Sequence, residues 1–225
     1  MKLVIFDLDD TLVNFAATRE VAYGEMARLL DGEGVDSKAF IQACVQVDRP
    51  LFLQFERGVL TRQQYRERRF ADPFGLIGVA PAGDIVPRLN KLFMDCVNDS
   101  PLLYDDVRPV LAALRGEGVQ TAILTNGPSD GQRRKLKATG LDAAVDHVAI
   151  GEEAGVSKPM ARAFHNVVER FAMKAHEVLM VGDSPELDYD GAVSAGLQAL
   201  LLDRDARHAD GSRPTIRSLR EIRPA

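Results

Sequence analysis

An apolar run that ends abruptly in acidic residues is the feature that most constrains this chain. The run Leu3–Phe6 is followed directly by Asp7-Leu8-Asp9-Asp10-Thr11. A short apolar run is typical of a buried strand in a parallel sheet, and its acids then lie at the edge where open α/β sheets bind ligands. Two carboxylates about 4 Å apart repel by roughly 4 kcal/mol at an effective dielectric of about 20. A hard cation that accepts oxygen ligands, such as Mg²⁺, would offset this repulsion.

The composition excludes several classes of partner. The chain has 225 residues, a net charge of −5 and a sequence pI near 5.4. Nucleic-acid binding needs a basic footprint, which this balance does not supply, so we expect no nucleic-acid partner. No apolar stretch approaches the roughly 18 residues that span a bilayer, so we expect no membrane partner.

The two cysteines and the N-terminal residues give information on the cellular compartment of the protein. Cys44 and Cys96 lie in apolar, helix-like stretches without a CxxC pattern or a nearby histidine, which predicts reduced, packed thiols. The apolar run at the N-terminus has four residues and is too short for a signal peptide. We therefore expect a cytoplasmic protein, as a monomer or a homodimer.

The hydrophobic periodicity divides the chain into three zones. Residues 1–14 hold the first strand and its acidic loop, residues 15–100 look all-helical, and beyond them strand-like and helix-like segments alternate. Strands are expected at 120–124, 145–150, 178–181 and 199–202, and helices at 107–115, 129–139, 161–171 and 186–194. This alternation predicts a parallel sheet that the early strand joins. The predicted fold is α/β: a Rossmann-like core of residues 1–14 and 101–225, flanked by helices, with an inserted all-helical domain at 15–100.

Two local signals subdivide the helical zone. Thr61, with Gln64 three positions later, predicts a capping box at the start of a helix that runs to Phe70. The stretch 71–83 contains three glycines and two prolines, which predicts a loop.

Polar groups follow four of the strand signals. They are Asp7, Asp9 and Thr11; Thr125-Asn126-Gly127; Lys158-Pro159; and Gly182-Asp183, with Asp188 five positions on. Each group alone is a common turn or helix cap. In a parallel sheet, however, all strands point the same way, so we expect the four groups to converge at one edge.

Such a set suits a phosphoryl group. A carboxylate in line with phosphorus can form an aspartyl-phosphate, and a carboxylate two positions on can protonate the leaving oxygen and then activate water. Thr125 can donate its hydroxyl proton, and Asn126 and Gly127 precede a helix whose free N–H groups attract anions. Lys158 supplies a positive charge, and Asp183 can join the metal.

These residues resemble the motifs of the haloacid dehalogenase superfamily of aspartate-nucleophile hydrolases. The run Asp7-Leu8-Asp9-Asp10-Thr11-Leu12 is similar to its first motif, Thr125 to the second, Lys158 to the third, and Gly182-Asp183 with Asp188 to the fourth. The resemblance implies a nucleophile at Asp7 and a general acid/base at Asp9. It also implies Mg²⁺ held by Asp7, by the main-chain carbonyl of Asp9 and by Asp183. Asp188 would orient the ligand shell or Lys158, and Lys158 would neutralise the nucleophile and the phosphoryl charge.

The resemblance also separates the reactions of this family. Members that cleave carbon–halogen bonds lack an acid at the position of Asp9, so its presence favours a phosphatase over a haloacid dehalogenase. A phosphomutase with the same core is the main alternative. A phospho-accepting signalling domain is disfavoured because Asp183 follows Lys158 and because a large helical insertion is present.

The helical insertion is similar to the cap domain of the family. The segment 52–70, and Thr125-Asn126-Gly127 followed by Gln132, Lys135 and Leu136, look like a branch that contains nucleotidases and sugar-phosphate phosphatases. Substrate specificity is expected from Asn14, Arg49, Phe52 and Arg57. The predicted activity is Mg²⁺-dependent hydrolysis of a small phosphate ester, such as a nucleotide or a sugar phosphate.

Overall fold

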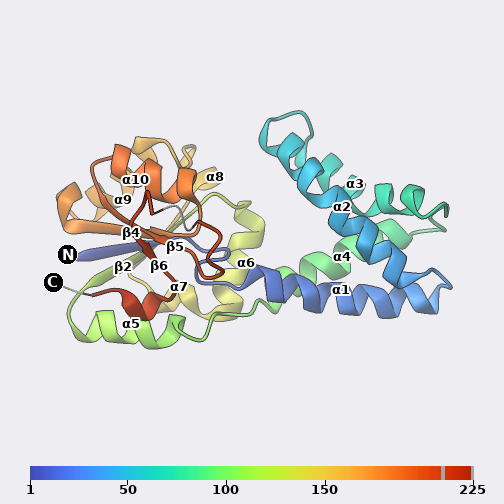
Figure 1. Cartoon of the computed structure of the whole chain (residues 1–225), viewed down its shortest axis with the longest axis horizontal. Coiled ribbons are helices and arrows are strands. Elements are labelled where there is room, and N and C mark those ends of the chain that lie inside the picture. Colours follow the sequence, from blue (N-terminus) through green and yellow to red (C-terminus); the bar gives the residue numbers. More distant parts are fainter. Residues whose placement is uncertain (209–210, 224–225) are drawn as a thin grey trace. The chain divides into compact units, whose positions relative to one another are not determined.

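The computed structural model describes residues 1–208 and 211–223, and the chain divides into two compact units. One unit comprises Met1–Ala16 and Ser100–Ala225, and the other comprises Ala17–Asp99. We call them the core unit and the helical unit (Figure 1). No helix among the described residues is both long enough and apolar enough to cross a membrane.

The core unit is built on a parallel sheet, which confirms the predicted fold class. Within the described residues six strands are hydrogen-bonded in the order β3-β2-β1-β4-β5-β6, and every pairing is parallel. Their bounds are β1 Leu3–Phe6, β2 Gln120–Thr125, β3 His147–Ile150, β4 Val178–Gly182, β5 Gln198–Leu202 and β6 Thr215–Ile216. The short β6 was not predicted, and the strand expected from residue 145 begins at His147.

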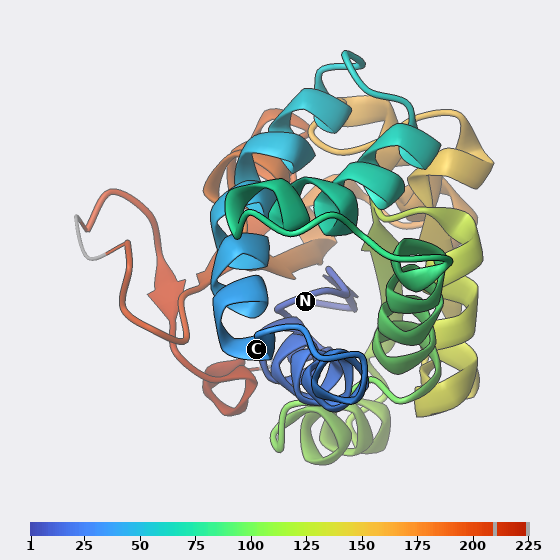
Figure 2. The same cartoon turned by 90° about the vertical axis from the view of Figure 1, so that its right-hand side faces the viewer.

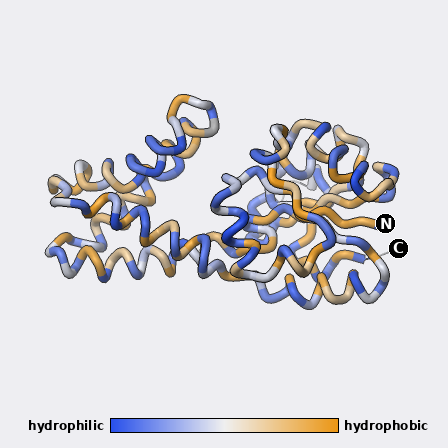
Figure 3. The backbone as a smooth tube through the Cα atoms, turned by 180° about the vertical axis from the view of Figure 1, so that it is seen from behind, coloured by the Kyte–Doolittle hydropathy of each residue, from blue (hydrophilic) through white to orange (hydrophobic). Residues whose placement is uncertain are grey.

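Both faces of the sheet are covered, as the fully apolar β1 requires. Val4 and Phe6 pack on one side with α5 (Val107–Gly116), and Leu3 and Ile5 pack on the other with α9 (Ala161–Arg170). Figure 1 shows these helices on opposite faces of the sheet, and Figure 3 shows β1 as a hydrophobic segment inside the unit.

Shorter elements complete the core unit. They are α6 (Ser129–Thr139), α7 (Leu141–Ala144), α8 (Gly151–Ala154), η1 (Ala175–Glu177), η2 (Pro185–Asp190), α10 (Gly191–Ser194) and η3 (Leu219–Glu221). The helix predicted at 186–194 is a π-helical turn, η2, continued by α10. The bounds of α6 match the prediction, and Gly140 ends the helix in the left-handed conformation that glycine adopts easily.

The helical unit contains α1 (Phe15–Gly32), which starts in the core unit, with α2 (Ser37–Glu56), α3 (Arg62–Leu76) and α4 (Ile85–Asp99). Figure 2 gives a second view of these helices, and α3 packs against both α2 and α4. The predicted capping box is present: the Gln64 N–H donates to Thr61 Oγ1 at 3.2 Å, and the Thr61 N–H donates to Gln64 Oε1 at 2.8 Å.

The prediction of a loop at 71–83 is wrong for its first half, because α3 continues to Leu76 through Pro73. A proline inside a helix costs about 3 kcal/mol. Here the aromatic residues on either side of it are fully buried: Phe74 contacts Phe40 with ring centroids 4.6 Å apart, and Phe70 contacts Phe93 at 5.3 Å. Burial of large aromatic side chains outweighs the cost of the proline.

The C-terminal segment is anchored to the core unit by one buried carboxylate. Asp106, at the start of α5, forms an ion pair with Arg204 at 2.9 and 3.0 Å. It also accepts hydrogen bonds from the Ser218 hydroxyl and the Leu219 N–H. Arg204 also donates to the Thr11 carbonyl, so the same network reaches the loop after β1.

Replacing Asp106 by asparagine should lower the free energy of unfolding by about 3 kcal/mol at pH 7, because Arg204 loses its charge partner. Burial raises the pKa of Asp106, but hydrogen bonds from Arg204, Ser218 and Leu219 outweigh burial and hold the pKa below its usual value. The stability from such a carboxylate is present above the unfolded-state pKa, about 3.9, and is lost as the pH falls through the folded-state pKa. Urea unfolding of the two proteins should therefore differ less at acidic pH.

Asp105→Asn is the matched control. Its side chain is exposed and pairs with Arg220 at the surface, so little change in stability is expected. Equal destabilisation by the two substitutions would contradict the anchoring role of Asp106.

Candidate active site

The site lies at the carboxyl ends of the three central strands. Asp7 follows β1, Thr125 is the last residue of β2, and Asp183 follows β4. Because β1 pairs with both β2 and β4, three loops that are far apart in the sequence meet at one edge of the sheet.

A buried lysine joins two of the carboxylates. Lys158 Nζ lies 2.5 Å from Asp7 Oδ1 and 2.5 Å from Asp188 Oδ1. Burial lowers the pKa of Lys158, but the adjacent Asp188 and Asp7 outweigh burial and raise it above its usual value. Lys158 is therefore a fixed positive charge between the two acids.

Asn126 holds the main chain of this lysine. Its amide donates to the Lys158 carbonyl at 2.8 Å, and its Oδ1 accepts from the Lys158 N–H at 2.9 Å. The expected contribution of Asn126 to phosphate binding would thus come from its main chain, because its side chain bonds to Lys158.

The turn that follows β4 fixes the position of the Asp188 carboxylate. Its Oδ2 accepts from the Ser184 N–H at 3.0 Å, and its side chain is packed directly against Gly182. A Cβ on Gly182 would lie 2.2 Å from Asp188 Oδ2, so only glycine leaves room for the carboxylate.

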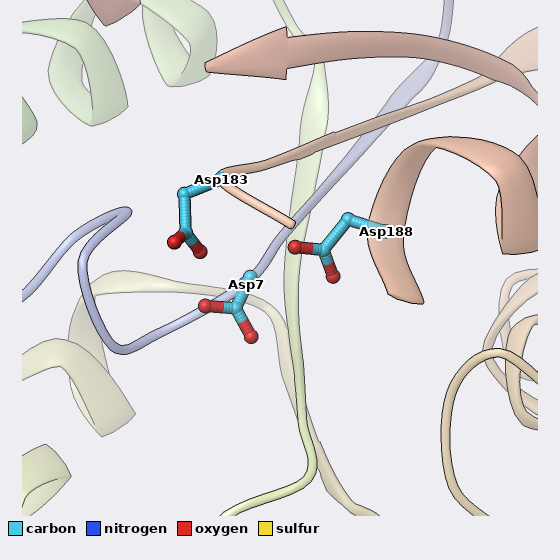
Figure 4. Close-up of side chains that lie close together, drawn as sticks. All are labelled: Asp7, Asp183 and Asp188. Atoms are coloured by element: carbon cyan, nitrogen blue, oxygen red, sulfur yellow. The ribbon is translucent and has the colours of Figure 1, made fainter. Parts of the chain in front are cut away.

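Three carboxylates form a candidate metal centre. Oxygen atoms of Asp7, Asp183 and Asp188 all lie within 4.8 Å of one another (Figure 4). Burial raises the pKa of Asp7 well above its ordinary value, Lys158 opposes that rise, and Asp188 and Asp183 add to it. Burial and the neighbouring Asp188 and Asp10 raise the pKa of Asp183 to about 7. Three acids around one ammonium leave an excess of negative charge, so an oxygen-ligated cation fits this cluster.

Asp9 is not a member of that group of three carboxylates, and its side chain is bonded to α6. Lys135 Nζ contacts Asp9 Oδ1 at 2.5 Å, and Gln132 Nε2 donates to Asp9 Oδ2 at 2.8 Å. Gln132 Nε2 also donates to Thr125 Oγ1 at 2.7 Å. The sequence marks Gln132 and Lys135 only as part of the family resemblance and predicts no role for them. Their three-residue spacing on a helix that follows the Thr125 loop is the signal that could have marked them.

Of the residues expected to select the substrate, Asn14 belongs to the core unit and the other three belong to the helical unit. The main-chain N–H of Asn14 donates to the Leu102 carbonyl at 2.7 Å. Arg49, Phe52 and Arg57 lie in the helical unit, and both arginines are exposed. Phe52 contacts Phe55 and Tyr65 with centroid distances of 6.1 and 5.8 Å.

Arg69 of the helical unit contacts aromatic rings. It is buried, with its guanidinium carbon 4.7 Å from the Phe70 ring centroid and 4.5 Å from that of Phe93. Burial lowers the pKa of Arg69 from its usual value. No local sequence signal distinguishes Arg69 from the exposed Arg49 and Arg57, and only its packing separates it from them.

Comparison with known proteins shows the family of this chain. The family model of haloacid dehalogenase-like hydrolases matches residues 1–196, so the chain belongs to that family of hydrolases. The match includes the loops that carry Asp7, Thr125, Lys158 and Asp183.

Individual relatives span nearly the whole chain. Pyrimidine 5'-nucleotidase YjjG of Escherichia coli is 30% identical, with 97% of this chain and 95% of that protein covered. Phosphoserine phosphatase of Thermus thermophilus is 29% identical, with 99% and 98% covered. The crystal structure of YfnB from Bacillus subtilis bound to magnesium superposes with a TM-score of 0.80 at 24% identity, covering 98% of this chain and 96% of that one.

Gly182→Ala should destabilise the core unit by about 1–3 kcal/mol, because the added methyl group overlaps the Asp188 carboxylate. Gly116→Ala, at the end of α5, is the matched control, since its Cβ would have no neighbour within 4 Å. We expect that control to be neutral or up to about 1 kcal/mol more stable. Thermal unfolding distinguishes the two, and a neutral Gly182→Ala variant would contradict the close packing of Asp188.

Proposed function

We propose that this chain is a Mg²⁺-dependent phosphatase that hydrolyses small phosphate monoesters through an aspartyl-phosphate on Asp7. The observation that carries the proposal is the placement of Asp7 at the strand end, beside the Lys158 ammonium and two further carboxylates. The E. coli relative is a pyrimidine 5'-nucleotidase and the T. thermophilus relative a phosphoserine phosphatase, and the substrates of both contain a phosphate monoester.

Asp7 acts as the nucleophile. An oxygen of its carboxylate forms a bond to phosphorus while the bond from phosphorus to the ester oxygen breaks. Lys158 favours the ionised form of the buried Asp7 and offsets the charge of the incoming phosphoryl group. The Thr125 hydroxyl and the main-chain N–H of Asn126 bind the phosphoryl oxygens, whereas the Gly127 N–H donates to Thr125 Oγ1.

Asp9 carries the proton in both half-reactions. It donates a proton to the departing ester oxygen, and the alcohol leaves. It then accepts a proton from water, which attacks the aspartyl-phosphate, releases inorganic phosphate and restores Asp7. A halide leaving group needs no proton, so an acid fixed at this position favours phosphate esters over haloacids.

Asp7, Asp183 and the main-chain carbonyl of Asp9 would hold Mg²⁺, with Asp188 beside them. When bound, the ion neutralises charge on the phosphoryl oxygens and orients them for in-line attack. The magnesium-bound structure of YfnB is consistent with this use of the fold.

The helical unit is proposed as the cap that selects the substrate. The relatives differ in substrate, one acting on pyrimidine nucleotides and one on phosphoserine, so the phosphate is the part their substrates share. We propose a nucleotide or a sugar phosphate as the substrate.

Asp7→Asn should reduce hydrolysis by at least about 1,000-fold, because the neutral amide is a poor nucleophile. Phosphate release is measured with Mg²⁺ on a panel of nucleotides, sugar phosphates and phosphoserine. Asp105→Asn serves as the control and should retain full activity. Turnover by the Asp7→Asn protein at the level of the unaltered protein would contradict the assignment.

Mg²⁺ should raise the unfolding temperature of the protein, because a ligand at 100 times its dissociation constant stabilises the folded state by about 2.7 kcal/mol. Asp183→Asn should lose most of that shift, whereas Asp190→Asn, whose carboxylate pairs with Arg213, should keep it. The measurement is a thermal melt with Mg²⁺ and with EDTA. An equal shift in both variants would place the ion elsewhere.

A further inference from the structure

Two buried polar side chains on α6 have no part in the mechanism derived above. Gln132 and Lys135 are 1% and 6% exposed. Burying an ammonium and an amide is costly unless both are well paired, and apolar residues would serve packing at least as well. The reason for polar residues at positions 132 and 135 must therefore be sought in the groups that they contact.

The Gln132 amide has two N–H groups, and both are used. One donates to Asp9 Oδ2 and the other to Thr125 Oγ1. Its nitrogen lies so close to Gly127 that a Cβ there would be 2.2 Å from it. One amide, held against one glycine, thus contacts the proposed proton carrier and the proposed phosphate-binding hydroxyl together.

The bonds to Thr125 determine where its own proton points. Thr125 Oγ1 accepts from Gln132 Nε2 at 2.7 Å and from the Gly127 N–H at 3.3 Å. Two N–H donors on this oxygen turn the hydroxyl proton away from both Gln132 and Gly127. The proton is then available to an acceptor in the loop region where the phosphate is expected.

Lys135 fixes the other oxygen of Asp9. Its ammonium contacts Asp9 Oδ1 and lies 5.2 Å from the centre of the Phe15 ring. The Lys135 side chain is buried, with 7% of its surface exposed, whereas 32% of the Asp9 side chain is exposed. The carboxylate is therefore held from the protein side while part of it faces solvent.

We propose that Gln132 and Lys135 are positioning residues of the phosphatase reaction. They hold the Asp9 side chain in the place where its protonated form donates to the leaving oxygen and the resulting carboxylate then accepts a proton from water, and Gln132 also orients the Thr125 hydroxyl. This inference rests on the proposed function, in which Asp9 transfers the proton.

The test compares two substrates by kcat/KM, which reports the steps up to the first release of alcohol. Glycerol 2-phosphate has an alkoxide leaving group that needs a proton. 2,4-Dinitrophenyl phosphate has a stable phenolate leaving group that needs none. General acid catalysis contributes about 100- to 10,000-fold. Lys135→Met should therefore lower kcat/KM for glycerol 2-phosphate at least about 30-fold and for the dinitrophenyl ester less than about 3-fold.

Gln132→Met is the second variant and keeps the test decisive if Lys135→Met does not fold. It should show the same preferential loss on glycerol 2-phosphate. It should also raise the inhibition constant of inorganic phosphate several-fold, because Thr125 loses its orientation. Lys137→Met is the matched control: the same change, on the same helix, at an exposed position, with both substrates unaffected. Circular dichroism verifies the fold of each variant.

Equal losses on the two substrates would assign both residues a purely structural role and overturn the inference. Undiminished activity on both would overturn it as well. In either case the unaltered protein remains a phosphatase, so the proposed function stands. Failure of the unaltered protein to hydrolyse any phosphate ester with Mg²⁺ would instead overturn the proposed function, and this inference with it.

Discussion

The site depends on one buried ammonium between two carboxylates. Without Lys158, Asp7 and Asp188 would face each other and Asp183 with no internal cation, in surroundings where burial already raises the pKa of Asp7 and Asp183. One positive charge among three acids leaves the cluster with a net negative charge, which suits a divalent cation. The Lys158 ammonium reduces the repulsion within the cluster, and a divalent cation would offset the rest.

Contacts with the main chain hold Lys158 and Asp188 in position. Asn126 bonds to both main-chain groups of Lys158, and Gly182 lets Asp188 lie directly on β4. These contacts connect the loops after β2 and β4 to the lysine, while β1 between them carries Asp7. Hydrogen bonds between neighbouring loops fix the positions of the side chains that those loops carry. In this site every loop bonds to another.

Parts of the fold could be read from local patterns, and others could not. The strands of the sheet and the bounds of α6 follow from apolar runs and from Gly140. Local signals failed at Pro73, where buried Phe70 and Phe74 keep α3 helical, and at β6, a two-residue strand held by pairing with β5. In both places the stabilising contacts come from residues distant in sequence, which periodicity does not record.

The sequence by itself determined the family and the parallel sheet, and it marked Asp7, Thr125, Lys158 and Asp183 as candidate site residues, because strand signals precede them and parallel strands end at one edge. Only the tertiary structure decided which groups touch. It paired Lys158 with both Asp7 and Asp188, assigned the Asn126 side chain to Lys158, and brought Gln132 and Lys135 to Asp9. These contacts span 30 to 151 residues and depend on sheet order and helix packing, which no local pattern encodes.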